Sequence, residues 1–228
     1  MKAVLFDIDG TLILSGGAGS RALSQAFKKL YRRDKALDGI KPDGRTDPAI
    51  IREMCRKALG RDCSGDELES LCRQYLHFLS REVPVSPGYR VMPGIPELLE
   101  KLELKEDVIM GLATGNLEEG ARVKLKRAGL NRYFRFGGFG SDCEDRVELT
   151  RIAISRSQEY IGQELKKQDI YIVGDTPFDI RSSTLLGTTS VAVATGSYST
   201  TQLKECQPDF LFSDLSAPEP LLKALSNA

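Results

Sequence analysis

The chain has little of what several common sites need. Its 228 residues include one histidine, His77, and no tryptophan. Phosphatases that use a phosphohistidine, and hydrolases with several histidine metal ligands, need at least two histidines. His77 lies among apolar residues at helical spacing, which indicates packing or exposure rather than chemistry. Any general acid or base is therefore expected among the carboxylates.

Charge of one sign and long apolar runs are also missing. The formal net charge is zero, so the overall charge favours neither nucleic acid nor a membrane surface as a partner. No apolar stretch approaches the roughly 18 residues of a membrane-spanning helix, and the N-terminus lacks a signal-peptide pattern. The five cysteines are odd in number and form no CxxC pair, which predicts reduced thiols. We therefore expect a soluble, cytoplasmic protein.

Short apolar runs alternate with helical patterns along most of the chain. Such runs are typical of strands in a parallel sheet that helices cover on both faces. The expected strands are Ala3–Ile8, Val108–Ala113, Ile170–Val173, Val191–Ala194, Phe210–Phe212 and, more weakly, Phe134–Gly140. The expected helices between them are Pro96–Leu104, Leu117–Ala128, Val147–Ile161 and Pro177–Leu186. The pattern predicts a doubly wound, Rossmann-like α/β sheet with a site at the carboxyl ends of its strands.

The segment from about Ser15 to Val91 breaks this alternation. It has helical patterns at Arg21–Tyr31, Pro48–Leu59 and Asp66–Val83, and no convincing strand. Stretches rich in Gly, Ser or Pro border the segment, as is common for hinges. We therefore expect a catalytic core of residues 1–14 and 92–228, and a helical cap domain of residues 15–91 inserted after the first strand.

Carboxylates come directly after two of the expected strands. Asp7 and Asp9 follow the first strand, in FDIDGT, and Thr11 adds a hydroxyl there. Asp175 and Asp179 follow another strand, in GDTPFD. Burying acids in this way is costly unless a cation or hydrogen bonds compensate their charge.

A third strand ends in LATGN. Thr114 supplies a hydroxyl, and Gly115 and Asn116 supply backbone N–H groups near the start of a helix, which suit an anion. Oxygen ligands without histidine or cysteine favour Mg²⁺. Magnesium between carboxylates and a phosphate is the usual arrangement for phosphoryl transfer. The prediction depends on the side chains at positions 7, 9 and 175 converging around one divalent ion.

These motifs, in this order over essentially the whole chain, resemble the haloacid dehalogenase superfamily, in particular its phosphatases of the phosphoglycolate-phosphatase type. The resemblance implies that Asp7 attacks phosphorus and forms an aspartyl-phosphate, while Asp9 protonates the leaving group and then deprotonates water. It implies that Asp7, Asp175 and the backbone carbonyl of Asp9 hold Mg²⁺, with Asp179 beside them or bound through water. It also implies that Thr114 binds the transferring phosphoryl group.

The resemblance further calls for a basic residue beside the nucleophile, normally a lysine. Arg146 lies at the distance before the second acidic motif where the resemblance expects this lysine. Its guanidinium has the same charge as an ammonium but a different geometry. Lys124 is the alternative, although its spacing places it on a helix face. Arg45, after Gly44, is the candidate for substrate contact from the helical segment. A plain turn in which Asp47 caps the next helix explains the same residues.

Two further patterns resemble unrelated sites. Cys55–Arg61 has the Cys-x5-Arg spacing of phosphatases with a thiolate nucleophile, but it is expected on a helix, where no phosphate loop forms. Gly17–Ala22 resembles a dinucleotide fingerprint, but it begins too far after the first strand. A hinge followed by a helix start explains it better.

The expected function is hydrolysis of a small phosphorylated metabolite, phosphoglycolate-like or a sugar phosphate, by a monomer or a homodimer. Dehalogenases lack the second aspartate of the first motif, so Asp9 argues against carbon–halogen chemistry. A hexose-phosphate mutase stays open, because mutases use both aspartates. A regulatory protein that accepts phosphate on Asp7 without turnover stays open as well.

Overall fold

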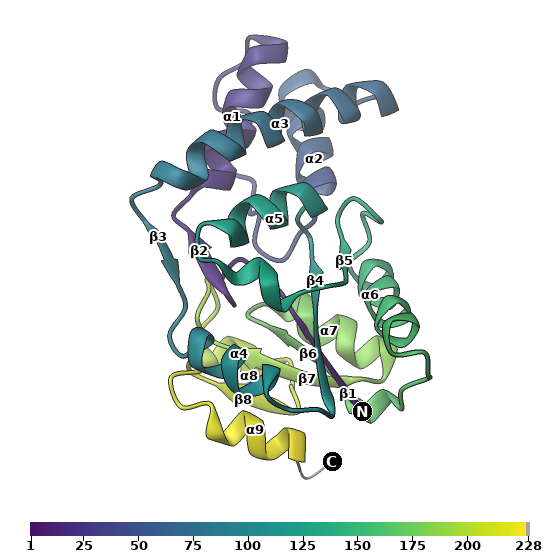
Figure 1. Ribbon diagram of the computed structural model, residues 1–228. Helices are drawn as coiled ribbons and strands as arrows, with labels where there is room; N and C mark the ends of the chain where they lie inside the picture. The colour runs from purple at the N-terminus through teal and green to yellow at the C-terminus, as the bar shows by residue number, and fades with distance from the viewer. Residues whose placement is uncertain (227–228) are drawn as a thin grey trace.

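The computed structural model describes residues 1–226, in which six parallel strands form one sheet in the order β5-β4-β1-β6-β7-β8 (Figure 1). The strands are β1 (Lys2–Phe6), β4 (Val108–Thr114), β5 (Gly137–Phe139), β6 (Ile170–Gly174), β7 (Thr189–Val193) and β8 (Phe210–Phe212). Central β1 pairs with β4 on one side and with β6 on the other. Because the chain moves outward from β1 in both directions, the predicted doubly wound fold is confirmed.

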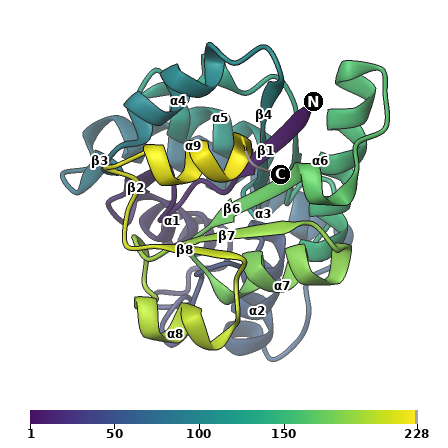
Figure 2. The ribbon, with the colours of Figure 1, turned by 90° about the horizontal axis from the view of Figure 1, so that it is seen from below.

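Helices cover both faces of this sheet (Figure 2). One face carries α4 (Ile95–Glu103), α5 (Glu118–Lys126) and α9 (Glu219–Ser226), and the other carries α6 (Arg146–Ile161), α7 (Pro177–Leu186) and α8 (Thr200–Glu205). Successive side chains of β1 point to opposite faces: Phe6 packs in the apolar cluster that includes α4 and α9, and Leu5 packs in the cluster that includes α6. This two-sided burial explains why the strands have continuous rather than alternating apolar runs.

The expected strands and helices of the core are all present, with small shifts at their ends. Gly162 and Gly187 end α6 and α7 in the left-handed conformation, with φ of 69° and 71°. The helix expected to run to Ala128 ends at Lys126, and Gly129 precedes a 3₁₀ helix, Leu130–Tyr133. The sequence did not predict α8, a short helix in which Leu203 supplies the buried apolar contact.

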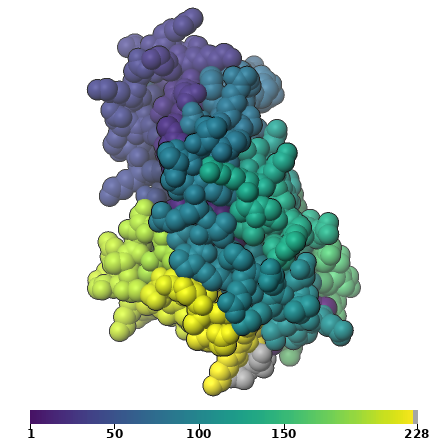
Figure 3. Space-filling model, turned by 60° about the vertical axis from the view of Figure 1, so that its left-hand side comes forward, coloured from purple at the N-terminus to yellow at the C-terminus, as the bar shows by residue number. Residues whose placement is uncertain are grey.

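The segment between β1 and α4 forms a helical layer beyond the carboxyl edge of the sheet, made of α1 (Ala18–Tyr31), α2 (Asp47–Leu59) and α3 (Gly65–Val85) (Figure 3). These helices share an apolar cluster of their own, which includes Phe27, Met54 and Leu79. The expected helices of this segment are therefore confirmed, while its division from the core as a separate domain stays a prediction.

A two-stranded ribbon joins this helical insert to the core. Strands β2 (Ile13–Ser15) and β3 (Tyr89–Val91) pair antiparallel, with Ile13 opposite Val91. The expectation that residues 15–91 contain no strand is therefore wrong at Tyr89–Val91. Strands of three residues are too short to give a recognisable pattern, and here two sequence-distant segments hold each other in register.

Two of the patterns singled out in the sequence lie outside any site. Cys55 is buried on α2, which includes the pattern as far as Leu59, so a helix occupies the place where a phosphate loop would have to form. His77 is exposed on α3. None of the helices within residues 1–226 combines the length and the apolar character that crossing a bilayer requires.

Candidate active site

Asp7 and Asp9 follow β1, but their side chains separate. The N–H of Asp7 donates to the carbonyl of Val173 at 2.9 Å and keeps Asp7 in line with the sheet. The chain then bends, because the N–H of Ile13 returns to the carbonyl of Ile8 at 3.0 Å. The Asp7 side chain is 6% exposed and the Asp9 side chain 38%. The two carboxylates therefore differ in burial, although both residues line the same cavity.

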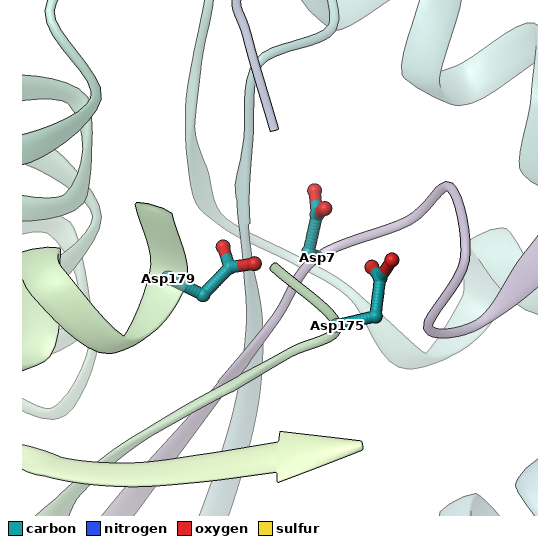
Figure 4. A group of neighbouring side chains, drawn as sticks. All are labelled: Asp7, Asp175 and Asp179. Atoms are coloured by element: carbon teal, nitrogen blue, oxygen red, sulfur yellow. The ribbon is translucent and has the colours of Figure 1, made fainter. Parts of the chain in front are cut away.

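Three buried carboxylates meet at the ends of β1 and β6 (Figure 4). One oxygen each of Asp7, Asp175 and Asp179 lies within 4.8 Å of the others. The expected convergence of positions 7, 9 and 175 is therefore wrong for Asp9, and Asp179 takes its place. Asp179 also accepts hydrogen bonds from the N–H and the hydroxyl of Thr176, at 3.0 and 2.7 Å, which close the first turn of α7 and fix its carboxylate.

The turn after β1 fits closely around Asp175. Thr11 Oγ1 donates to Asp175 Oδ1 at 3.0 Å, so this hydroxyl orients a member of the acidic cluster. A role of Thr11 in binding substrate stays a prediction. Gly10 has a φ of 86°, and an added Cβ would lie 2.3 Å from Asp175 Oδ2. Both the backbone angle and the space therefore require glycine at this position.

Arg146 brings a guanidinium to the cluster. It is the first residue of α6, whose N-terminus Asp145 caps, and its side chain is 9% exposed. Its Nη2 lies 3.2 Å from Asp7 Oδ1 and also contacts Asp179 Oδ1. The structure thus places Arg146 beside the predicted nucleophile, where the sequence analysis expected a cation.

The cluster is short of positive charge. Burial raises the pKa of Asp7 to about 6; Arg146 opposes this shift and Asp179 adds to it. Burial also raises the pKa of Asp175 well above its ordinary value, and the charges of Asp7 and Asp179 add to the shift. A hard divalent cation that binds oxygen ligands would reduce the repulsion among the three carboxylates, which one guanidinium offsets only in part. The residues present therefore fit the Mg²⁺ that the sequence predicted.

These raised pKa values predict how the stability of the metal-free protein depends on pH. A carboxyl whose pKa is higher in the folded state keeps a proton that the unfolded chain releases, so its contribution to stability is lost as the pH rises through the folded pKa. In EDTA, Asp7→Asn should therefore gain stability relative to the original protein between pH 4 and 7, by about 3 kcal/mol. Urea unfolding of both proteins at several pH values measures this difference.

Magnesium is the control for that measurement. Because the ion would compensate the carboxylates of the original protein, millimolar Mg²⁺ should shrink the pH-dependent difference. A difference that stays constant from pH 4 to 7 would mean that the carboxyl of Asp7 titrates as an ordinary aspartate.

The end of β4 contributes the residues predicted to bind the anion. Thr114 is fully buried, and its Oγ1 accepts a hydrogen bond from Asn116 Nδ2 at 2.8 Å. Thr114, Gly115 and Asn116 all line the same cavity as Asp7. Asn116 Nδ2 also donates to Asp9 Oδ2 at 2.9 Å, so its side chain orients a carboxylate as well as a hydroxyl.

Lys124 lies on α5, as its helical spacing predicted, but on a face of the helix that is turned into the site. Its side chain is 5% exposed, and Nζ lies 2.5 Å from Asp9 Oδ2 and 2.5 Å from Asn116 Oδ1. Desolvation favours the neutral form of Asp9, but the Lys124 ammonium together with hydrogen bonds from Asn116 and Ser15 outweighs it and holds the pKa of Asp9 below its ordinary value. Lys124 shares the buried side of α5 with Ala121 and Leu125, a position where sequence patterns predict an apolar residue.

The loop before α2 closes over the end of β4. The N–H of Asp47 donates to the carbonyl of Gly115 at 2.8 Å, and Asp47 Oδ2 accepts from the N–H of Leu117 at 2.9 Å. Thr46, not Asp47, caps α2, so the capping role suggested for Asp47 is wrong. An added Cβ at Gly115 would lie 2.2 Å from the carbonyl oxygen of Arg45, so the loop approaches this closely only because residue 115 has no side chain.

Arg45 lines the cavity, but its guanidinium is already bound. It pairs with Glu53 and donates to the carbonyl of Ala49 at 3.3 Å, both on α2. Substrate contact by Arg45 therefore stays a prediction, and it would require the guanidinium to leave Glu53.

A cavity of about 470 Å³ separates the sheet from the helical insert. This is within the range of sites for small molecules. Residues from the core include Asp7, Thr114, Arg146 and Asp175, and residues from the insert include Ser20, Asp47 and Tyr75. The sequence analysis missed Asp47 and Tyr75 as cavity residues. Burial raises the pKa of Asp47 to about 6, although nothing in the sequence marks this acid as buried.

Comparison with known proteins places this geometry in context. The model of the family described as haloacid dehalogenase-like hydrolase matches residues 4–193. A phosphoglycolate phosphatase from Aquifex aeolicus is 31% identical over 229 residues, covering 100% of this chain and 98% of that protein.

Solved structures share the fold. The crystal structure of a hydrolase from Pseudomonas syringae has a TM-score of 0.74 at 20% identity, covering 98% of both chains. That of a β-phosphoglucomutase from Clostridium difficile has a TM-score of 0.75 at 14% identity, covering 99% of this chain and 97% of the other.

Proposed function

Because the chain belongs to the haloacid dehalogenase-like hydrolase family, we propose that it is a magnesium-dependent phosphatase of small phosphorylated metabolites, with Asp7 as the nucleophile. The observation that carries the proposal is the cluster of Asp7, Asp175 and Asp179 with Arg146 against a cavity of about 470 Å³. Phosphoglycolate and sugar phosphates are the substrates considered, because the Aquifex aeolicus relative is named a phosphoglycolate phosphatase and a cavity of this size accommodates either. We propose a cytoplasmic location, which the five free cysteines support.

Asp7, Asp175 and the backbone carbonyl of Asp9 would hold the metal, with Asp179 beside them. Bound there, Mg²⁺ supplies positive charge that offsets the carboxylates and the phosphate oxygens. Both oxygens of Asp179 already accept hydrogen bonds from Arg146 or Thr176, which supports an indirect role for this residue.

The first chemical step forms a bond from Asp7 to phosphorus. A carboxylate oxygen of Asp7 attacks, the bond from phosphorus to the substrate oxygen breaks, and its electron pair stays on that oxygen. Asp9 in its protonated form, which is the minor form because Lys124 lowers its pKa, donates the proton that the leaving oxygen needs. Arg146 keeps Asp7 oriented and offsets negative charge beside it, and Thr114 holds the phosphoryl group.

In the second step water attacks the phosphorus of the aspartyl-phosphate. Asp9 takes the proton of this water, the bond from Asp7 to phosphorus breaks, and inorganic phosphate leaves with Asp7 restored. We propose that residues 15–91 form a cap that opens to admit substrate and closes to exclude other water. The close contact of Arg45 with Gly115 and the hydrogen bonds of Asp47 support a closed position in this structure.

The proposal predicts multiple turnovers of p-nitrophenyl phosphate that depend on Mg²⁺. Phosphate release should exceed the enzyme concentration many times and should stop when EDTA removes the metal. Release of one equivalent or less, with label retained on Asp7, would instead identify a regulatory protein that accepts phosphate.

Hydrolysis rates measured on a panel of 2-phosphoglycolate and hexose phosphates then narrow the range of candidate substrates. Hydrolysis of a panel member faster than of the aryl phosphate supports a metabolite phosphatase. An isomerised sugar phosphate formed without release of phosphate would identify a mutase and contradict the proposal.

A further inference from the structure

Lys124 forms a closed triangle of hydrogen bonds with Asp9 and Asn116. Its Nζ donates to Asp9 Oδ2 and to Asn116 Oδ1, each at 2.5 Å, and Asn116 Nδ2 donates to Asp9 Oδ2 at 2.9 Å. Each of the three side chains thus contacts the other two. Since the Lys124 side chain is 5% exposed, these acceptors replace the water that an ammonium needs.

The triangle matters because Asp9 lies in an open part of the site, where Ser15 adds one further hydrogen bond to its side chain. Asp9 stands beyond the end of β1, after the bend at Ile8, and 38% of its side chain is open. A carboxylate there would turn freely about its side-chain bonds without directed partners. Two donors on Oδ2, one charged, restrict it to one orientation.

Lys124 and Arg146, the buried cations among the described residues that line the cavity, have separate partners. Arg146 contacts Asp7 and Asp179, whereas Lys124 contacts Asp9 and Asn116. Since Arg146 already lies beside the nucleophile, the proposed chemistry leaves Lys124 without a use. Its contacts connect it to the acid and base of that chemistry instead.

We propose that Lys124 is a positioning residue that holds the Asp9 carboxyl where it exchanges protons with the leaving oxygen and with the attacking water. The inference rests on the proposed function, because it requires Asp9 to act as acid and base. Lys124 acts through Asp9, and Asn116 completes the arrangement by bonding to both of them.

Coupling between Lys124 and Asp9 tests this role. With Mg²⁺ and p-nitrophenyl phosphate, Lys124→Met should lower kcat on the order of 10²-fold with little change in KM, the effect of misplacing the base that activates the attacking water. In the Asp9→Asn background the same change should lower kcat less than about 2-fold, because Asp9 is no longer there to be positioned. The aryl substrate keeps the double variant measurable, since its leaving group needs little protonation.

Two controls keep the result interpretable. Lys126→Met removes an ammonium from the exposed side of the same helix and should leave kcat unchanged. Thermal unfolding shows whether Lys124→Met folds. If it does not fold, Lys124→Gln takes its place, because the shorter amide removes the charge and keeps a polar group in the cavity.

The outcomes separate the inference from the proposed function. If Lys124→Met loses as much activity in the Asp9→Asn background as in the original protein, Lys124 acts on the phosphate or on the fold and the inference is overturned. An unchanged kcat in Lys124→Met with a slow Asp9→Asn overturns the inference alone. An unchanged kcat in Asp9→Asn overturns the acid and base assignment of the proposed function.

Discussion

Asp7→Asn should abolish turnover while leaving the fold intact. An amide oxygen is a poor nucleophile toward phosphorus, so kcat should fall by at least about 10⁴-fold, as when the nucleophile of other covalent enzymes is removed. The side chain keeps its size, and its charge is lost from a cluster where burial and Asp179 already disfavour the ionised form. Initial rates with Mg²⁺ and p-nitrophenyl phosphate measure the loss.

Two measurements show that this loss is chemical. Thermal unfolding in EDTA at pH 7 should place the midpoint of Asp7→Asn at or above that of the original protein, because one of three clustered charges is gone. Asp107→Asn makes the same substitution at an exposed position before β4 and should keep full activity. Substantial turnover by Asp7→Asn would refute the assignment of the nucleophile.

Arg146→Met should lower both activity and stability. The guanidinium bridges Asp7 and Asp179, so its loss leaves buried carboxylates without their cation. We expect kcat to fall about 10²–10³-fold, the usual effect of removing a directed charge from a catalytic site. In EDTA the free energy of unfolding should fall by about 3 kcal/mol, since one partner of a buried ion pair is removed.

Arg146→Lys is the matched control, because it keeps the charge on a shorter, single-headed side chain. It should recover part of the stability and less of the activity. Rates and urea unfolding with and without Mg²⁺ distinguish the two effects. If Arg146→Met keeps full activity while Lys124→Met loses it, the cation that catalysis requires is Lys124, the alternative that the sequence left open.

The sequence predicted the sheet well because its signals are local. Each core strand is a short apolar run ending in a small or polar residue, and helix ends such as Gly162 and Gly187 follow backbone geometry that glycine favours. The same locality explains the position of Asp7 and Asp175, since each comes directly after a strand whose end is fixed by the sheet.

What the sequence could not predict depends on contacts between distant segments. The bend at Ile8 turns Asp9 away from the cluster, and that bend is recognisable only once Ile13 returns to bond with it. A lysine on a helix usually faces solvent. Lys124 is buried because two other segments of the chain bring Asp9 and Asn116 to its ammonium as acceptors. The burial of Asp47 likewise involves a distant partner, because its carboxylate accepts from the N–H of Leu117, seventy positions away in the chain.

The paired strands β2 and β3 decide what kind of motion the helical insert can make. The two chain crossings are hydrogen-bonded along Ile13–Ser15 and Tyr89–Val91, so they form one flat strip rather than two loose tethers. In the opening proposed for residues 15–91, the two crossings would therefore move together rather than independently. Each closing would return Asp47 to the same N–H of Leu117.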